Sequence, residues 1–449
     1  MADHNVLDFG ARGDGQNNDA VAIQAAIDVC TQAGGGRVVL PSGRIFLSGT
    51  LRLESNVDLH LERGATLLGS PRWADYTLRL QVGALSGGTV DADAPQSSML
   101  ITADGAHNAA ITGGGTIDGN GRAFVLADEG YIYRMPRERP FTLFLRRCRN
   151  LTLRDVTVRD GALWTVRLSG CEDVLIHAIH IDNDLKLPNN DGIDLDRCRG
   201  VRISDCHIVS GDDCICLKCC QETAGMGPCE NITVTGCTLN STSSALILGA
   251  EVREPIRNVI FDACVIHSSH RGLAVHLNEN SDIENVLFSN MIVETRYFHD
   301  KWWGRGEPIY ITAFPWSAGQ AVGRVLHVRF KNVLCHSENG VYIHGWQPGL
   351  IDDILLEDVR VELDKWSRWP AGQADIRPYP GESILQQPTA GFYVQNAGRV
   401  VLRNCEAVFT PGLPDSYRHA VEAHQVADLV LENFHGSAAR PGLPAILRD

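Results

Sequence analysis

The chain has 449 residues, 44% of them hydrophobic and 21% charged, and its net charge is −14. This composition excludes a disordered chain, and no run approaches the roughly 18 consecutive apolar residues that a membrane-spanning helix needs. The negative charge argues against nucleic acid and an anionic membrane surface as partners, because like charges repel one another.

The N-terminus and the cysteines both bear on location. Met1-Ala2-Asp3-His4 lacks the basic segment followed by an apolar one that marks a secretory signal. The 14 cysteines do not follow a small disulfide scaffold. Cys214 and Cys216 alternate within an apolar run, where cysteine serves as a small hydrophobe, and no nearby histidine completes a zinc site. We therefore expect reduced cysteines and a cytoplasmic protein.

Residues 19–33 carry the one clear amphipathic helical pattern. Asn18 or Asp19 suits the N-cap, and Gly34 suits the position after the helix. The apolar residues near helical spacing are Val21, Ala25, Ile27 and Cys30. We expect this helix to cap the N-terminal end of the fold, within a cap region of residues 1–50.

An internal repeat dominates the rest of the chain. Copies of one alternating apolar and polar unit include NLTLRDVTV at 150–158, DVLIHAIHI at 173–181, GVRISDCHI at 200–208 and NITVTGCTL at 231–239. Alternation with period two is typical of half-buried strands, and the polar segments between copies show no helix-length pattern. Since a strand cannot bury its apolar face alone, the repetition predicts stacked coils that share one core.

The predicted fold is therefore all-β, a parallel β-helix that forms one domain over residues 1–449. The longer gaps between copies predict inserted side loops, which we place at 297–316 and 363–390. Loops on such a scaffold often carry binding residues.

Two neighbouring segments are rich in carboxylates, PNNDGIDLD at 188–196 and SGDDCICLK at 210–218. Asp191 and Asp212 are 21 residues apart, close to one predicted coil, so Asp191 should lie beside Asp212 and Asp213. Three like charges so close cannot all ionise easily, and at least one should keep a proton near neutral pH. Such a pairing suits glycosidic hydrolysis, whereas clustered aspartates also suit Ca²⁺, and the cluster alone leaves both open.

These two segments resemble the Asn-x-Asp and Gly-Asp-Asp motifs of glycoside hydrolase family 28, the polygalacturonases. VLDFGARGDG at 6–15, GGGTIDGNG at 113–121 and ALWTVRLSGC at 162–171 are similar to its bacterial branch. The resemblance spans roughly residues 5–295. It implies a right-handed parallel β-helix and inverting hydrolysis of an oligosaccharide, without a metal or another cofactor.

The resemblance also assigns roles to individual residues. By motif match, Asp212 is the acid, Asp191 and Asp213 activate water, and Asn189 positions them. Two other family motifs are replaced in this chain. Ser244 stands where Gly-His-Gly has its histidine, and Ala274-Val275-His276 stands at Arg-Ile-Lys, which holds the galacturonate carboxylate in the family.

The lost clamp puts recognition of a uronate carboxylate in doubt, because no guanidinium or ammonium group remains at its positions. Arg271, three residues earlier, could compensate if its side chain reaches the cleft. The predicted substrate-binding residues of this region are Lys218, Ser244, Arg271 and His276.

The segment 297–316 is rich in aromatic residues. Trp302 and Trp303 suit a sugar-stacking surface, although packing of the loop onto the scaffold explains them equally well. Arg305 or Glu307 would contact a terminal sugar. A loop of this length can close one end of a groove, which predicts cleavage from a chain end.

The sequence thus predicts an inverting glycosidase of α-linked, pectin-type oligosaccharides. One alternative is a glycosidase of the same fold that acts on a neutral or non-galacturonate glycan. Another is a non-catalytic β-helix that binds carbohydrate through Ca²⁺. A lyase is disfavoured, because β-elimination needs a strong base such as Arg or Lys and this cluster consists of carboxylates.

Overall fold

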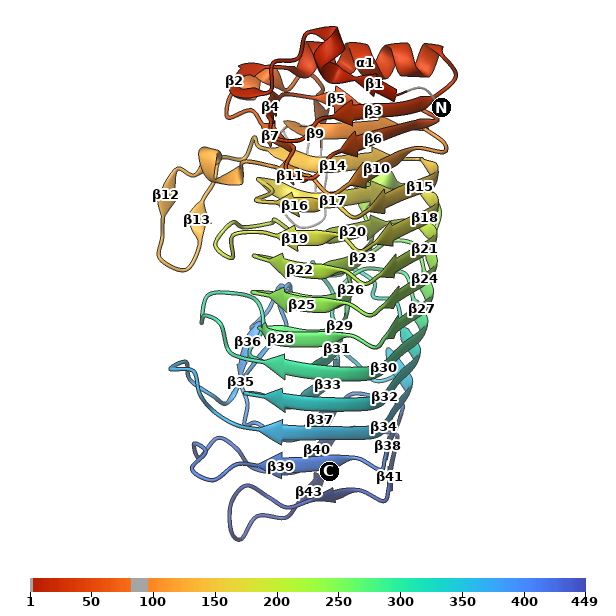
Figure 1. Cartoon of the computed structure of the whole chain (residues 1–449). Coiled ribbons are helices and arrows are strands. Elements are labelled where there is room, and N and C mark those ends of the chain that lie inside the picture. The colour runs from red at the N-terminus through yellow and green to blue at the C-terminus, as the bar shows by residue number, and fades with distance from the viewer. Residues whose placement is uncertain (1–2, 82–95) are drawn as a thin grey trace. The chain divides into compact units, whose positions relative to one another are not determined.

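The computed structural model describes residues 3–81 and 96–449 (Figure 1). Strands dominate, and most of them pair in parallel. The chain divides into two compact units: unit 1 comprises Met1–Ile215 and Cys220–Gly227, and unit 2 comprises Cys216–Cys219 and Pro228–Asp449. The expectation of one domain over the whole chain stays a prediction.

In unit 1 the chain returns to the same three rows of parallel strands with each coil. The first row is β1 (Asp3–Asn5), β3 (Gly36–Leu40), β6 (Val57–Leu61), β10 (Ala110–Gly113), β15 (Arg149–Arg154), β18 (Glu172–His177) and β21 (Arg199–Ser204). The second row is β2 (Asp14–Asn18), β4 (Ile45–Ser48), β7 (Thr66–Gly69), β11 (Thr116–Asp118), β16 (Thr157–Arg159), β19 (His180–Asp182) and β22 (His207–Ser210). The third row is β5 (Leu51–Arg52), β9 (Gln96–Asp104), β14 (Pro140–Arg146), β17 (Leu163–Ser169) and β20 (Ile193–Asp196).

Register explains the core of unit 1. Leu151, Val174 and Val201 stand opposite one another on β15, β18 and β21, and all three are buried. Asp155, with φ 64°, bends the chain between β15 and β16 into the left-handed region that Asp tolerates. The predicted strands at 150–158, 173–181 and 200–208 are each two short strands on either side of a bend. Hydrophobic periodicity does not reveal such a bend.

Helix α1 (Ala20–Gln32) lies within the predicted range 19–33 and packs on β1, β3, β5 and β6 (Figure 1). The Oδ1 atom of Asn18 accepts the N–H of Ala20 at 3.0 Å. The buried residues are Ile23, Ala26, Ile27 and Cys30. Val21 is 84% exposed, so the prediction that it shares this face is wrong. The packed face follows i, i+3, i+4 and i+7 spacing from Ile23, and Val21 lies outside it.

The predicted cap region of residues 1–50 is also too long. Its residues 36–40 and 45–48 form β3 and β4, which pair with β6 and β7 as part of the stack. Among the described residues, no helix is both long and apolar enough to cross a membrane.

Unit 2 repeats the arrangement of three rows. The first row is β24 (Cys229–Thr235), β27 (Ile256–Asp262), β30 (Ile283–Thr295), β32 (Val325–Ser337), β34 (Ile351–Leu363), β38 (Arg399–Arg403) and β41 (Asp428–Glu432). The second row is β25 (Thr238–Ser241), β28 (Val265–Ser269), the C-terminal halves of β30, β32 and β34, β39 (Glu406–Phe409) and β42 (His435–Gly436). The third row is β26 (Ser244–Val252), β29 (Arg271–Leu277), β31 (Ile309–Ala313), β33 (Val341–Gly345), β37 (Phe392–Gln395), β40 (Val421–His424) and β43 (Ile446–Arg448).

Aromatic stacking extends the core of unit 2. Phe261, Phe288 and Phe330 stack on successive coils with ring centroids 4.9 and 4.8 Å apart. All 14 cysteines of the chain are buried, which agrees with their prediction as small apolar side chains.

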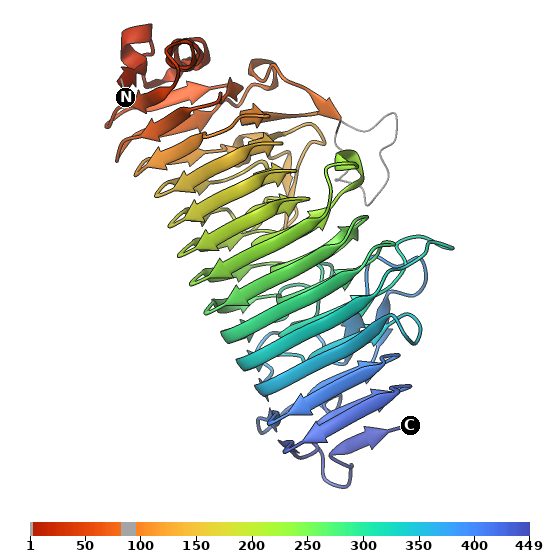
Figure 2. The same ribbon diagram turned by 90° about the vertical axis from the view of Figure 1, so that its right-hand side faces the viewer.

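Two insertions interrupt the coils of unit 2. Residues 296–308 join β30 to β31, and residues 364–391 carry the antiparallel pair β35 (Gln373–Asp375) and β36 (Ile384–Gln386). Figure 2 shows both insertions on one side of the strands of unit 2. The first predicted loop, 297–316, extends too far, because Ile309 and Ile311 are buried in β31 and make it a strand of the third row.

Candidate active site

Three carboxyl groups come together in unit 1. Asp191, Asp212 and Asp213 each contribute an oxygen, and these oxygens all lie within 4.8 Å of one another. All three residues are more than nine-tenths buried. The predicted proximity is thus confirmed. It arises because the two turns lie on neighbouring coils, where the N–H of Gly192 donates to the carbonyl of Asp213 at 2.8 Å.

Asn190 fastens the two turns to each other. Its Oδ1 atom accepts the N–H of Gly211 at 2.8 Å, and its Nδ2 atom donates to the carbonyl of Asp184 at 3.1 Å. Its carbonyl accepts the hydroxyl of Ser210 at 2.8 Å and the side-chain amide of Asn183 at 2.8 Å. Asn190 is fully buried, and sequence reasoning missed this role because Asn is also a common turn residue.

Glycine is required where the turns approach each other. A Cβ atom on Gly211 would lie 2.5 Å from the carbonyl oxygen of Leu187 and 2.7 Å from Oδ1 of Asn190. A Cβ atom on Gly192 would lie 2.5 Å from the carbonyl oxygen of Cys214. The glycine that precedes the Asp212–Asp213 pair is therefore a steric requirement of the site.

Asn189 and Arg139 flank the carboxyl groups. The Nδ2 atom of Asn189 lies 3.5 Å from Oδ2 of Asp212, and its positioning role stays a prediction. Arg139 donates from Nη2 to Oδ1 of Asn189 at 2.9 Å and from Nε to the carbonyl of Ala162 at 2.6 Å. Burial lowers the pKa of Arg139 to about 10, against the opposing charge of Asp191. Arg139 therefore remains a cation beside the three carboxyl groups. Its hydrogen-bond partners lie far from it along the chain, so no sequence motif reveals them.

The chemistry of this cluster follows from its composition. Closely spaced carboxyl groups share protons, so one can donate a proton while a neighbour accepts one. The same oxygens also form the one group of three His, Cys, Asp or Glu side chains in the described ranges that could hold a metal ion. Acid–base catalysis and Ca²⁺ binding therefore both remain compatible with the geometry.

The remaining predicted site residues belong to unit 2. Lys218 lies in β23 (Ile215–Cys219) and forms an ion pair with Glu251, with Nζ 3.4 Å from Oε2. Ser244 is buried at the start of β26, opposite Arg271 of β29.

Arg271 and His276 meet at one aromatic ring. The Cζ atom of Arg271 lies 3.6 Å from the ring centroid of Tyr310, and its Nε atom lies 3.5 Å from Oε2 of Glu307. The His276 ring meets Tyr310 edge-on, with centroids 5.5 Å apart. Burial, then the charge of Arg271, lowers the pKa of His276 to about 3, so the ring is neutral near pH 7.

The aromatic loop is divided between surface and interior. Trp303 is 39% exposed and Trp302 is half-buried, whereas Arg305 and Glu307 are buried. Arg305 donates from Nη1 to the carbonyl of Trp302 at 3.2 Å, and its backbone N–H donates to Oε2 of Glu307 at 2.8 Å. Tyr310 is fully buried and packs in the scaffold. The structure thus gives Arg305 and Glu307 a part in shaping the loop that the sequence did not indicate.

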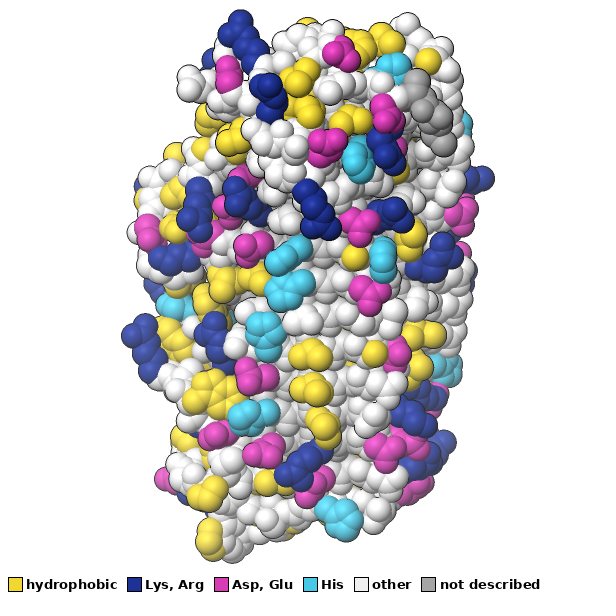
Figure 3. Space-filling model, in the orientation of Figure 1, with side chains coloured by type: hydrophobic (Ala, Val, Ile, Leu, Met, Phe, Trp, Pro, Cys, Tyr) yellow, Lys and Arg dark blue, Asp and Glu magenta, His cyan; other side chains and the backbone are white. Residues whose placement is uncertain are grey.

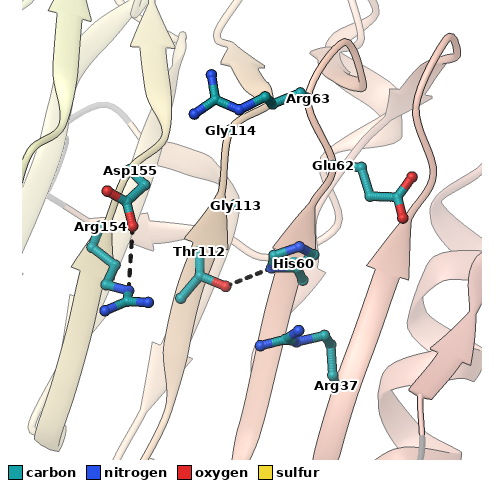
Figure 4. Close-up of a pocket in the computed structure, with 9 residues that line it drawn as sticks. All are labelled: Arg37, His60, Glu62, Arg63, Thr112, Gly113, Gly114, Arg154 and Asp155. Atoms are coloured by element: carbon teal, nitrogen blue, oxygen red, sulfur yellow. Dashed lines mark hydrogen bonds and ion pairs between the residues drawn. The ribbon is translucent and has the colours of Figure 1, made fainter.

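A separate groove of about 470 Å³ opens on unit 1 (Figure 4). Its lining residues are Arg37, His60, Glu62, Arg63, Thr112, Gly113, Gly114, Arg154 and Asp155. They include none of the predicted site residues, and they mix both signs of charge, as does the surface in Figure 3. We therefore place the candidate active site at the carboxyl cluster.

Known proteins resemble this chain in sequence and in fold. The model of the family described as glycosyl hydrolases family 28 matches residues 48–296. A probable polygalacturonase of Vitis vinifera is 31% identical over 255 residues, which are 55% of this chain and 51% of that protein. An exo-poly-α-D-galacturonosidase of Dickeya chrysanthemi is 26% identical over 295 residues, 55% of this chain and 47% of that protein. The chain thus spans about half the length of these relatives.

Solved structures resemble the fold over most of the chain. An exopolygalacturonase from Thermotoga maritima has a TM-score of 0.72 at 23% identity and covers 91% of this chain and 92% of its own. A family 28 exopolygalacturonase of Yersinia enterocolitica has a TM-score of 0.73 at 19% identity and covers 95% of this chain and 78% of its own.

Proposed function

The chain belongs to glycosyl hydrolases family 28, and from this premise we propose that it hydrolyses α-linked galacturonide oligosaccharides from a chain end. The observation that carries the proposal is the convergence of Asp191, Asp212 and Asp213 in unit 1. The exo-acting relative and the exopolygalacturonases of similar fold support action at a chain end.

In the proposed reaction, Asp212 donates its proton to the glycosidic oxygen while the bond to the anomeric carbon breaks. Asp191 and Asp213 accept a proton from water, whose oxygen forms the new bond to that carbon. Asn189 orients Asp212, and the charge of Arg139 offsets part of the negative charge of the cluster. Asn190 ties the two turns together through its bond to the N–H of Gly211.

Inversion at the anomeric carbon is part of the proposal and rests on the family resemblance. The three oxygens lie within 4.8 Å of one another, closer than the roughly 6.5–9.5 Å that is usual between inverting carboxyl groups. Proton NMR of the first product distinguishes the outcomes. An inverted β-anomer supports the proposal, and an initial α-anomer from the α-linked substrate would indicate retention.

A set of defined oligosaccharides tests the substrate class. We expect cleavage of α-linked galacturonides and little cleavage of neutral oligosaccharides of the same length, with saturated products and no new ultraviolet absorbance. Cleavage of neutral sugars alone would favour a glycosidase that acts on a neutral glycan, as the replaced clamp at Ala274 and His276 suggests. Loss of activity with EDTA and its return with Ca²⁺ would favour a calcium-dependent site.

We also propose that the coils of each unit wind as a right-handed parallel β-helix and that α1 caps unit 1. The burial of Ile23 and Ile27 against the first strands supports the cap. The proposed partner is the oligosaccharide substrate, with no cofactor, nucleic acid or membrane, and the proposed location is the cytoplasm.

A further inference from the structure

The second insertion of unit 2 covers the outward side of the third strand row. Tyr310, Tyr342 and Tyr393 stack on successive coils, with ring centroids 5.8 and 5.3 Å apart. Ala374 and Ile376 join their cluster from the segment that contains β35. The hydroxyl of Tyr310 donates to the carbonyl of Asp375 at 2.8 Å. The insertion is therefore packed against the scaffold at residues 374–376.

Asp375 connects this anchored insertion to the aromatic loop 296–308. Its Oδ2 atom accepts the N–H of Gly304 at 2.8 Å and lies 3.4 Å from Nη1 of Arg305. Its side chain is 1% exposed. Burial raises the pKa of Asp375, but the hydrogen bonds and charge of Arg377, with the charges of Arg305 and Arg271, lower it to about 2. Asp375 is thus a carboxylate at any moderate pH.

Arg377 forms the second connection. It binds Asp375 with Nε 2.9 Å from Oδ1 and Nη2 2.6 Å from Oδ2. The same guanidinium donates from Nη2 to the carbonyl of Trp302 at 2.5 Å and from Nη1 to the carbonyl of Lys301 at 3.3 Å. Its Cζ atom lies 4.9 Å from the ring centroid of Trp303. A bidentate ion pair together with a stacked ring fixes both the position and the orientation of the Arg377 guanidinium.

We propose that Asp375 and Arg377 are positioning residues that hold Trp302 and Trp303 in place, so that selection of a chain end depends on the second insertion as well as on the aromatic loop. This inference rests on the proposed function of the site. Figure 2 shows the two insertions on the same side of unit 2, as the contacts require. We call Asp375 and Arg377 together the brace. Without it, the aromatic loop would lose four hydrogen bonds to these two side chains and the cation over Trp303.

The test uses Asp375→Asn and Arg377→Met in the full chain. The matched control is Glu279→Gln, which alters another buried carboxyl group of unit 2 whose partners are Arg253, at 2.7 Å, and the N–H of Val252. On galacturonide oligomers we expect the first two variants to yield an early ladder of intermediate lengths, with a roughly tenfold increase in KM and a smaller change in kcat. Arg377 is 25% exposed, so Arg377→Met decides the matter if Asp375→Asn does not fold.

Iodide quenching of tryptophan fluorescence, measured well below the unfolding transition of each variant, reports the accessibility of Trp303 in the folded protein. The Trp303 signal is isolated by difference from Trp303→Phe in each background. We expect Trp303 to be quenched more strongly in the two brace variants, and no change in Glu279→Gln. Folded variants with wild-type products and wild-type quenching would overturn the proposal. If wild type cleaves no galacturonide, the proposed function has failed, and quenching alone still decides whether the brace holds the loop.

Discussion

Asp191, Asp212 and Asp213 lie close enough for each to sense the charge of the other two. Asp212→Asn removes the proposed proton donor and keeps nearly the same side-chain volume. We therefore expect kcat to fall by about 10²–10⁴-fold, with substrate binding largely retained. Steady-state kinetics on a galacturonide oligomer measure this, and circular dichroism verifies the fold.

Asp191→Asn and Asp213→Asn should also reduce kcat severely, because each removes a proposed acceptor of the water proton. Activity of all three variants within about tenfold of wild type, roughly 1.4 kcal/mol in the barrier, would contradict the assignment.

His276 makes stability depend on pH. Its pKa is lowered to about 3 by burial and then by Arg271, against an ordinary value of 6.5. Between these values the unfolded chain binds a proton that the folded chain excludes. The free energy of unfolding should therefore be highest above pH 6.5 and should fall as the pH falls toward 3. His276→Gln should flatten this slope by up to about 1.4 kcal/mol per pH unit.

Urea denaturation at pH 7, 6 and 5 measures the slope, with His435→Gln as an exposed control on β42. An unchanged slope in His276→Gln would show that the ring is not buried as a neutral group.

Sequence alone located the three aspartates, because a separation close to one coil places residues side by side in stacked coils. It did not reveal Arg139, which reaches Asn189 across 50 residues, or Asp375 and Arg377, which reach the aromatic loop across more than 70. Those distances depend on insertions whose paths no periodic pattern encodes. The replaced family motifs likewise gave no sign that Arg271 would stack on Tyr310.

Asn189 and Asn190 are adjacent in the turn before β20, and their variants should differ in their effects on stability and activity. Asn190→Ala removes the acceptor of the Gly211 N–H and leaves a buried donor unsatisfied, at a cost of about 1–3 kcal/mol. We expect it to reduce both stability and activity. Asn189→Ala loses its contacts to Asp212 and Arg139, and it should reduce activity with a smaller effect on stability, because Arg139 keeps its bond to the carbonyl of Ala162.

Thermal unfolding and kinetics of the two variants measure this difference. Equal loss of stability in both would contradict the separate roles.

Helix α1 offers a matched pair on its two faces. Ile27 is fully buried, so Ile27→Ala should lower the free energy of unfolding by about 2–4 kcal/mol. Val21 is 84% exposed, and Val21→Ala should change it by less than about 0.5 kcal/mol. Denaturant titration measures both. A small effect of Ile27→Ala would contradict the packing of α1 on unit 1.

Element by element, the sequence predicted what depends on periodicity and missed what depends on bends. The helix over 19–33 and the strand repeats follow from side-chain spacing. The bend at Asp155, whose φ is positive, separates β15 from β16, and that conformation leaves no periodic trace. β31 was hidden because its aromatic neighbours made the whole segment resemble a loop.

For the whole molecule, the residues that form the stacked coils differ from those proposed to select and cleave the substrate. Alternating apolar residues suffice to stack coils, which explains why the fold survives at low sequence identity to its structural neighbours. The proposed hydrolysis rests on the carboxyl cluster of unit 1, and the proposed selection of a chain end rests on the two insertions of unit 2. One experiment on products can therefore test both together.

That experiment is a time course of products from a long α-linked galacturonide, with wild type and Asp212→Asn side by side. We expect wild type to release the monosaccharide from the outset with a slow fall in viscosity, and Asp212→Asn to release little or none. An early ladder of intermediate lengths with a rapid fall in viscosity would contradict action at a chain end. No cleavage by wild type, or equal cleavage by Asp212→Asn, would contradict galacturonide hydrolysis at this carboxyl cluster.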